Sequence, residues 1–72
     1  MRTASLVKMA NQIAASVPDQ GAAVDQTAAH LRLFWTPTMI DTLAAHLHDH
    51  PGSVSAPVRE AVRQLRPEQV AP

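Results

Sequence analysis

The sequence predicts an all-α protein, a small bundle of about four short helices that forms a single domain over residues 1–72. Large apolar residues recur every three or four positions in four segments, as in helices with one buried side. Prolines and other turn-forming residues separate these segments. No segment alternates apolar with polar residues, and Phe34 and Trp35 are the only aromatic Phe, Tyr or Trp residues, so no strand is predicted.

The first helix is expected from about Thr3 to Val17. Its apolar side carries Leu6, Met9, Ile13 and Val17. Its opposite side carries Ser5, Lys8, Asn11 and Gln12. The segment Pro18-Asp19-Gln20-Gly21 then suits a turn.

The second and third helices meet at Thr36-Pro37. The second helix has the apolar stripe Val24, Ala28, Leu31 and Trp35, flanked by Thr27 and Phe34. It should stop before Pro37, because the residue that precedes a proline disfavours helical geometry. Thr36 is expected to cap the third helix, which has Pro37 in its first position and ends around His50.

A fourth helix is expected to begin at Ser55, a candidate cap, or at Ala56, and to end before Pro67. Its inward residues are Val58, Ala61, Val62 and Leu65. From about residue 67 to 72 we expect a flexible tail.

The composition predicts a marginal core and a protein that works by binding a partner. Of the 72 residues, 13 are alanine, and none is cysteine, so neither a disulfide nor a thiolate metal site adds stability. The absence of cysteine fits a reducing compartment, and no apolar run approaches a membrane span, so we expect a cytoplasmic protein that does not contact a membrane. The net charge of zero gives no general attraction for nucleic acid.

The sequence offers no catalytic site and no cofactor site. A 72-residue helical chain gives little depth for a nucleophile, a base and an orienting acid. Gly21 and Gly52 are isolated from each other, so there is no glycine-rich phosphate loop. We therefore expect that the chain is not an enzyme by itself.

The strongest candidate for a metal site is a histidine cluster that consists of His46, His48 and His50. His46 and His50 have the spacing of zinc-binding helices. However, Leu47 replaces the glutamate of the His-Glu-x-x-His motif, and no further ligand is evident. We interpret these histidines as favourable groups at a helix C-terminus and predict no metal site.

Arg59, Arg63 and Arg66 fall on one edge of the fourth helix. They could contact acidic groups of a partner, although a solvated face is the more ordinary interpretation. A small nucleic-acid-binding regulator would use the same stripe, with the second and third helices as a helix-turn-helix. The neutral net charge counts against that alternative.

The aromatic segment around the second helix end is a candidate interface. Leu33 lies opposite the apolar stripe and should be exposed. Trp35 fits either the core or an interface, Phe34 is expected in the core, and Met39 could serve either purpose.

Several sequence blocks together resemble one family, the delta subunit of cytoplasmic NAD-dependent (molybdenum) formate dehydrogenase. The blocks are Leu6-Val7-Lys8-Met9-Ala10-Asn11-Gln12-Ile13-Ala14, then His30-Leu31, Phe34-Trp35, Pro37, Met39 and Leu43, then Pro57-Val58, Ala61-Val62 and Leu65. Ala15 and Ser16 stand where aromatic residues are common in the family, and Thr36 and Thr38 replace the more usual Asp and Arg.

The resemblance implies a place in an oxidoreductase complex that converts formate to carbon dioxide and passes electrons to NAD. Other subunits would carry bis-molybdopterin guanine dinucleotide with molybdenum, iron–sulfur clusters and FMN. The delta subunit would be a non-catalytic accessory subunit that supports assembly, cofactor maturation or stability and contacts the large catalytic subunit and other subunits. The resemblance is compatible with a permanent subunit and with a chaperone that leaves the finished complex. Our candidate partner contacts are Lys8, Asn11, Gln12, Leu33, Phe34, Trp35, Met39, Arg59, Arg63 and Arg66.

Overall fold

The computed structural model describes residues 2–70, which form five α-helices and two short 3-10 helices. In chain order they are α1 (Thr3–Ala15), η1 (Gln20–Ala22), α2 (Ala23–Phe34), α3 (Pro37–Asp49), η2 (Pro51–Ser53), α4 (Ala56–Leu65) and α5 (Pro67–Val70). The described residues contain no strand. The predicted all-α class and its four main helices are therefore confirmed.

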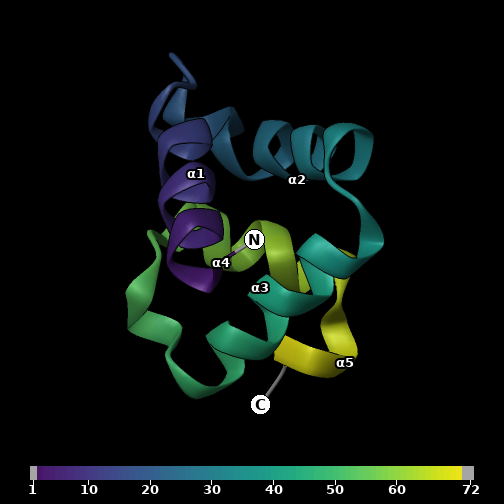
Figure 1. The fold of residues 1–72 in the computed structure, drawn as a ribbon. Helices are drawn as coiled ribbons and strands as arrows, with labels where there is room; N and C mark the ends of the chain where they lie inside the picture. The colour runs from purple at the N-terminus through teal and green to yellow at the C-terminus, as the bar shows by residue number, and fades with distance from the viewer. Residues whose placement is uncertain (1, 71–72) are drawn as a thin grey trace.

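The four longer helices surround one core. In Figure 1, α1 stands at one side, α2 crosses the top, and α4 passes behind α3. The most extensive packing is between α2 and α4, and α1 contacts α2, α3 and α4. The short α5 packs on α3 and α4. The molecule measures 28 × 26 × 20 Å.

Each of the four long helices contributes one or two large side chains to the core. The largest fully buried apolar residues are Leu6, Leu31, Leu43, Leu47, Val58 and Val62. Trp35 is also buried, with 6% of its surface exposed, and packs in the core, while its contact with a partner stays a prediction. At about 1.5 to 3 kcal/mol for each buried large side chain, these few residues supply most of the hydrophobic stabilisation.

Local capping explains where α3 begins. The Thr36 hydroxyl accepts a hydrogen bond from the Met39 amide at 3.2 Å, and Pro37 occupies the first turn. The missing N–H of proline costs nothing at that position. The cap that the sequence predicts at Thr36 is confirmed.

The structure departs from the sequence-based expectation at two helix ends. Ser55 occupies the residue before α4, but its side chain makes no capping bond. Instead, its backbone amide donates to the Oδ1 atom of Asn11 at 2.9 Å. Pro67–Val70 forms α5 where we expect a flexible tail, because Pro67 also suits the first turn of a helix; residues 71 and 72 lie outside the described residues.

Candidate interaction surface

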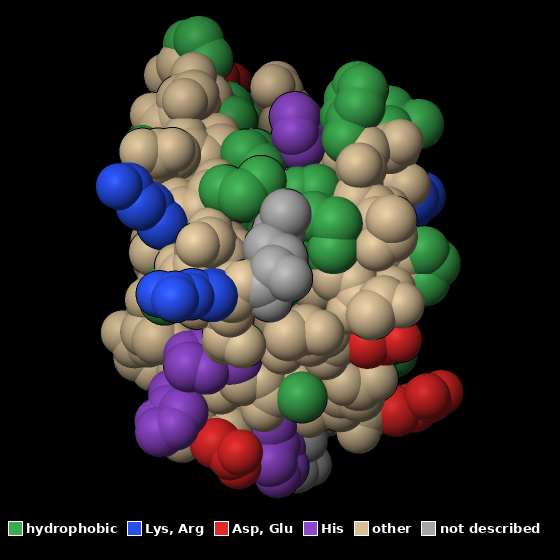
Figure 2. All heavy atoms as spheres, viewed as in Figure 1, with side chains coloured by type: hydrophobic (Ala, Val, Ile, Leu, Met, Phe, Trp, Pro, Cys, Tyr) green, Lys and Arg blue, Asp and Glu red, His purple; other side chains and the backbone are tan. Residues whose placement is uncertain are grey.

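A pair of large apolar side chains protrudes at the C-terminal end of α2. Leu33 is 74% exposed and Phe34 is 71% exposed. Figure 2 shows hydrophobic side chains gathered above the end of α2 and in the centre of the same face. Scattered exposed leucines are ordinary, but two adjacent large groups on a 72-residue chain form a distinct apolar edge.

The end of α2 explains why Phe34 and Trp35 point to different environments. Phe34 is the last helical residue, whereas Trp35 has extended backbone angles of φ −95° and ψ 146°. This change of direction carries Trp35 back into the core and leaves Phe34 outside. The expected core position of Phe34 is therefore wrong, and the predicted exposure of Leu33 is confirmed.

The Phe34 ring keeps one aromatic neighbour. Its centroid lies 4.8 Å from that of His30, one helical turn earlier, and the two ring planes are tilted by 44°. The two rings are thus in tilted aromatic contact, while Phe34 stays 71% exposed.

The three polar residues expected as contacts on α1 divide into two groups. Lys8 and Gln12 are exposed, and their side chains make no hydrogen bond or ion pair with other residues in the range 2–70. Asn11 is half-buried and bonds within the chain. Its Nδ2 donates to the Ser53 carbonyl at 3.5 Å, while its Oδ1 accepts from the Ser55 amide.

Sequence reasoning missed this structural use of Asn11. Its position on the polar side of α1 gave no sign of the contact, because Ser53 and Ser55 lie more than forty residues away along the chain. Asn11 connects α1 to Ser53, the last residue of η2, and to Ser55, the residue before α4. These side-chain hydrogen bonds give Asn11 a structural role within the chain.

The three arginines expected as a stripe make contacts within the chain: Arg59 and Arg63 lie on α4, and Arg66 directly follows it. Arg59 donates from Nη1 to the Pro51 carbonyl at 3.0 Å. Arg63 pairs with Glu60 at 3.4 Å, and Arg66 pairs with Asp41 at 2.6 Å. Two of the three positive charges thus face carboxylates, which weakens the stripe as an attractor of phosphate groups.

The remaining candidates lie around α3. Met39 is half-buried and packs against the core. His48 uses Nδ1 to contact the carbonyl of Gln69 at 3.2 Å, which requires the proton on that nitrogen. Among residues 2–70, no group of three His, Asp or Glu side chains is arranged to hold a metal ion.

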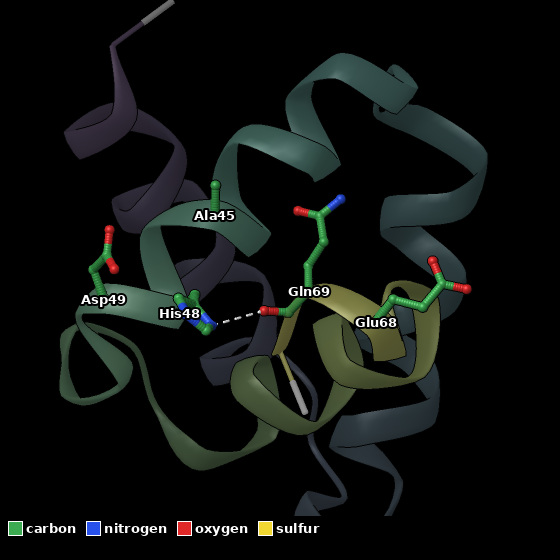
Figure 3. A pocket seen from close by; sticks show the side chains of 5 residues that line it. All are labelled: Ala45, His48, Asp49, Glu68 and Gln69. Carbon is green, nitrogen blue, oxygen red and sulfur yellow. Dashed lines mark hydrogen bonds between the residues drawn. The ribbon is translucent and has the colours of Figure 1, made fainter. Parts of the chain in front are cut away.

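A shallow hollow of about 360 Å³ lies between α3 and α5. It is lined by Ala45, His48, Asp49, Glu68 and Gln69. In Figure 3 the carboxylates of Asp49 and Glu68 lie apart, on opposite sides of the hollow. These residues therefore do not form the converging acid–base pair that hydrolytic chemistry needs.

The described fold and surface are those of a small helical protein with an exposed apolar edge. Over residues 2–70, no helix is both long enough and apolar enough to cross a bilayer. Residues 5–62 match the family described as NADH-dependant formate dehydrogenase delta subunit FdsD. Because the match spans most of the chain, the protein belongs to this family. Comparisons with curated proteins and with solved structures gave no match.

Proposed function

We propose that this chain is a non-catalytic accessory subunit of an NAD-dependent formate dehydrogenase, and that it supports assembly, cofactor maturation or stability of the catalytic subunits. Membership of the delta-subunit family supports the place in such a complex. The small core and the absence of a converging acid–base pair in the described hollow favour a binding role. The cytoplasm is the proposed compartment, since a chain without cysteine is suited to reducing conditions.

The exposure of Phe34 is the main observation that supports the proposed docking surface. Phe34 belongs to the block that makes the chain resemble the family, yet it is 71% exposed and adds little to the core. Large aromatic residues that the fold itself does not use are typical anchors of interfaces. The neighbouring Leu33 extends the apolar area that a catalytic subunit would cover.

Lys8 and Gln12 support a second contact area by the same reasoning. Both belong to the resembling block on α1, and both are exposed without a bond to another described residue. Asn11, in the same block, is explained by its bonds to Ser53 and Ser55. We therefore assign Lys8 and Gln12 to the partner interface and Asn11 to the fold.

The cofactors of the complex would lie in other subunits. We expect them to be bis-molybdopterin guanine dinucleotide with molybdenum, iron–sulfur clusters and FMN. This chain has no cysteine that could ligate an iron–sulfur cluster. Its proposed contribution is to bind the large subunit that holds the pterin, either during insertion or afterwards.

Co-purification with a tagged large catalytic subunit tests the proposal. The unmodified chain should co-purify, and Phe34→Ala should raise the dissociation constant about tenfold or more, as expected for the loss of an interface anchor. The double change Lys8→Ala and Gln12→Ala should weaken binding while leaving the helix intact, because alanine is the best helix former.

Gln26→Ala is the matched control, since Gln26 is exposed on the same helix as Phe34 and lies outside the resembling blocks. Failure of the unmodified chain to bind any formate dehydrogenase subunit would contradict the accessory role. Equal affinity of the unmodified chain and both interface variants would contradict only the assigned surface. The subunit stoichiometry of the mature complex then separates a permanent subunit from a chaperone that leaves.

A further inference from the structure

Two histidine rings lie next to each other at the C-terminal end of α3. His46 and His50 are one helical turn apart, their ring centroids are 5.0 Å apart, and their planes differ by 38°. His50 is exposed and His46 is half-buried, so solutes can reach the pair. Neither ring has a hydrogen-bond partner among residues 2–70.

The spacing of the rings suits a shared metal ion. Imidazole nitrogens bind zinc at about 2.0 to 2.1 Å, so two rings on one ion in tetrahedral or octahedral geometry have centroids roughly 4.5 to 5.2 Å apart. The observed separation of 5.0 Å lies in this range. The two rings are therefore close enough for nitrogens of both to reach one ion.

Backbone contacts hold His50 in place on both sides. Its amide donates to the His46 carbonyl at 2.8 Å, which continues the helical turn that sets the spacing of the two rings. Its carbonyl accepts from the Ser53 amide at 3.1 Å and from the Ser53 hydroxyl at 2.8 Å. A ligand that is already ordered loses less entropy when it binds an ion.

We propose that His46 and His50 form a two-ligand site for a divalent ion of the copper, nickel and zinc class. Paired imidazoles prefer these ions to magnesium or calcium, which prefer oxygen ligands. The partial negative charge at the end of a helix also favours a cation. Because the described residues offer no third ligand, water completes the coordination in the isolated chain. The sequence motif alone indicated no metal site, whereas the structure shows that the two rings lie side by side at one end of α3.

The test uses the full chain without a histidine tag, titrated separately with CuCl2, ZnCl2 and MgCl2 by isothermal titration calorimetry. Copper should bind one to one and more tightly than zinc, and magnesium should not bind. Either ion that binds should raise the thermal unfolding midpoint, because the folded helix presents both rings together. His46→Gln and His50→Gln should each lower the affinity about tenfold or more.

His48→Gln is the control on the same helix, because His48 contacts the Gln69 carbonyl and does not belong to the pair. It should bind copper as the unmodified chain does. Circular dichroism shows whether each variant keeps its helix content. Unchanged copper affinity in folded His46→Gln and His50→Gln, no binding by the unmodified chain, or a fall in its unfolding midpoint with copper would each overturn the site.

Discussion

At the scale of single residues, Thr27 stands out because its hydroxyl is buried without a partner. Its side chain is fully buried on α2, and Oγ1 has no hydrogen-bond partner within residues 2–70. A buried polar group without a bond costs about 1 to 3 kcal/mol. Replacing the hydroxyl by a group of the same shape should remove that cost.

Thr27→Val should therefore stabilise the fold by about 1 kcal/mol, since valine keeps the volume and has a similar helix propensity. The measurement is the urea midpoint of unfolding at unchanged slope. Thr27→Ser is the control, and it should destabilise the fold. It keeps the hydroxyl and loses a buried methyl group worth about 0.8 kcal/mol. A Val variant less stable than the original would show that the hydroxyl has a partner.

Asn11→Ala should lower the free energy of unfolding by about 1 kcal/mol, because the side chain bonds to two backbone groups before α4. Urea unfolding again gives the value. The adjacent Gln12→Ala should change stability by less than about 0.5 kcal/mol, as expected for an exposed position. Similar losses in both variants would contradict the structural role assigned to Asn11.

The sequence predicts the environment of some residues better than others. The exposure of Leu33 follows from helical periodicity, which places it opposite Leu31 and Trp35. The exposure of Phe34 does not, since its neighbour Leu31 is buried. The extended backbone at Trp35 turns Trp35 into the core and leaves Phe34 outside. A position at a helix end depends on where the chain turns, and periodicity carries no information about that turn.

At the scale of elements, α5 is joined to α3 by polar contacts. Arg66 Nε donates to Asp41 Oδ1 at 2.6 Å, and Gln69 donates to the same oxygen at 3.4 Å. The ion pair is partly exposed, with 29% of the Arg66 side chain and 50% of the Asp41 side chain accessible. Exposed ion pairs contribute about 0 to 1 kcal/mol, so α5 should detach more easily than the other helices.

Asp41→Asn should increase the hydrogen-exchange rate of the Gln69 amide, which bonds to the Arg66 carbonyl, while the global unfolding midpoint changes little. Added salt should have the same effect on the unmodified chain. The matched control is Glu60→Gln, which removes the other ion pair, between Arg63 and Glu60, and should leave α5 unchanged. Equal exchange rates in the Asp41→Asn variant and the original would show that apolar packing alone holds α5.

Helix boundaries are the part of the fold that local chemistry predicts well. Thr36 and Pro37 mark the start of α3 in both the sequence and the structure. Pro67 marks the end of α4 and also begins α5, because proline suits the first turn of a helix. At Ser55, local chemistry is a poor guide. The residue precedes α4 but does not cap it, and its amide donates a hydrogen bond to Asn11 on a distant helix.

At the scale of the whole molecule, the pairing of helices is what the sequence leaves open. Apolar stripes indicate which side of each helix is buried, but they do not indicate which other helix that side packs against. The most extensive packing, between α2 and α4, joins two helices that α3 separates in the sequence. The same limit applies to the candidate site. Family membership indicates a partner, whereas the division of Lys8, Asn11 and Gln12 between interface and fold depends on where distant backbone groups lie.

The burial of Trp35 gives the molecule an optical reporter of its own state. Trp35 is the only tryptophan in the chain and is buried in the core, directly after the exposed Phe34. Indole fluorescence shifts to longer wavelength when water reaches the ring, so unfolding should change the emission spectrum of this residue. A partner that covers Phe34 without disturbing the core should leave that spectrum nearly unchanged. One fluorophore can therefore distinguish docking of the folded chain from docking that remodels it.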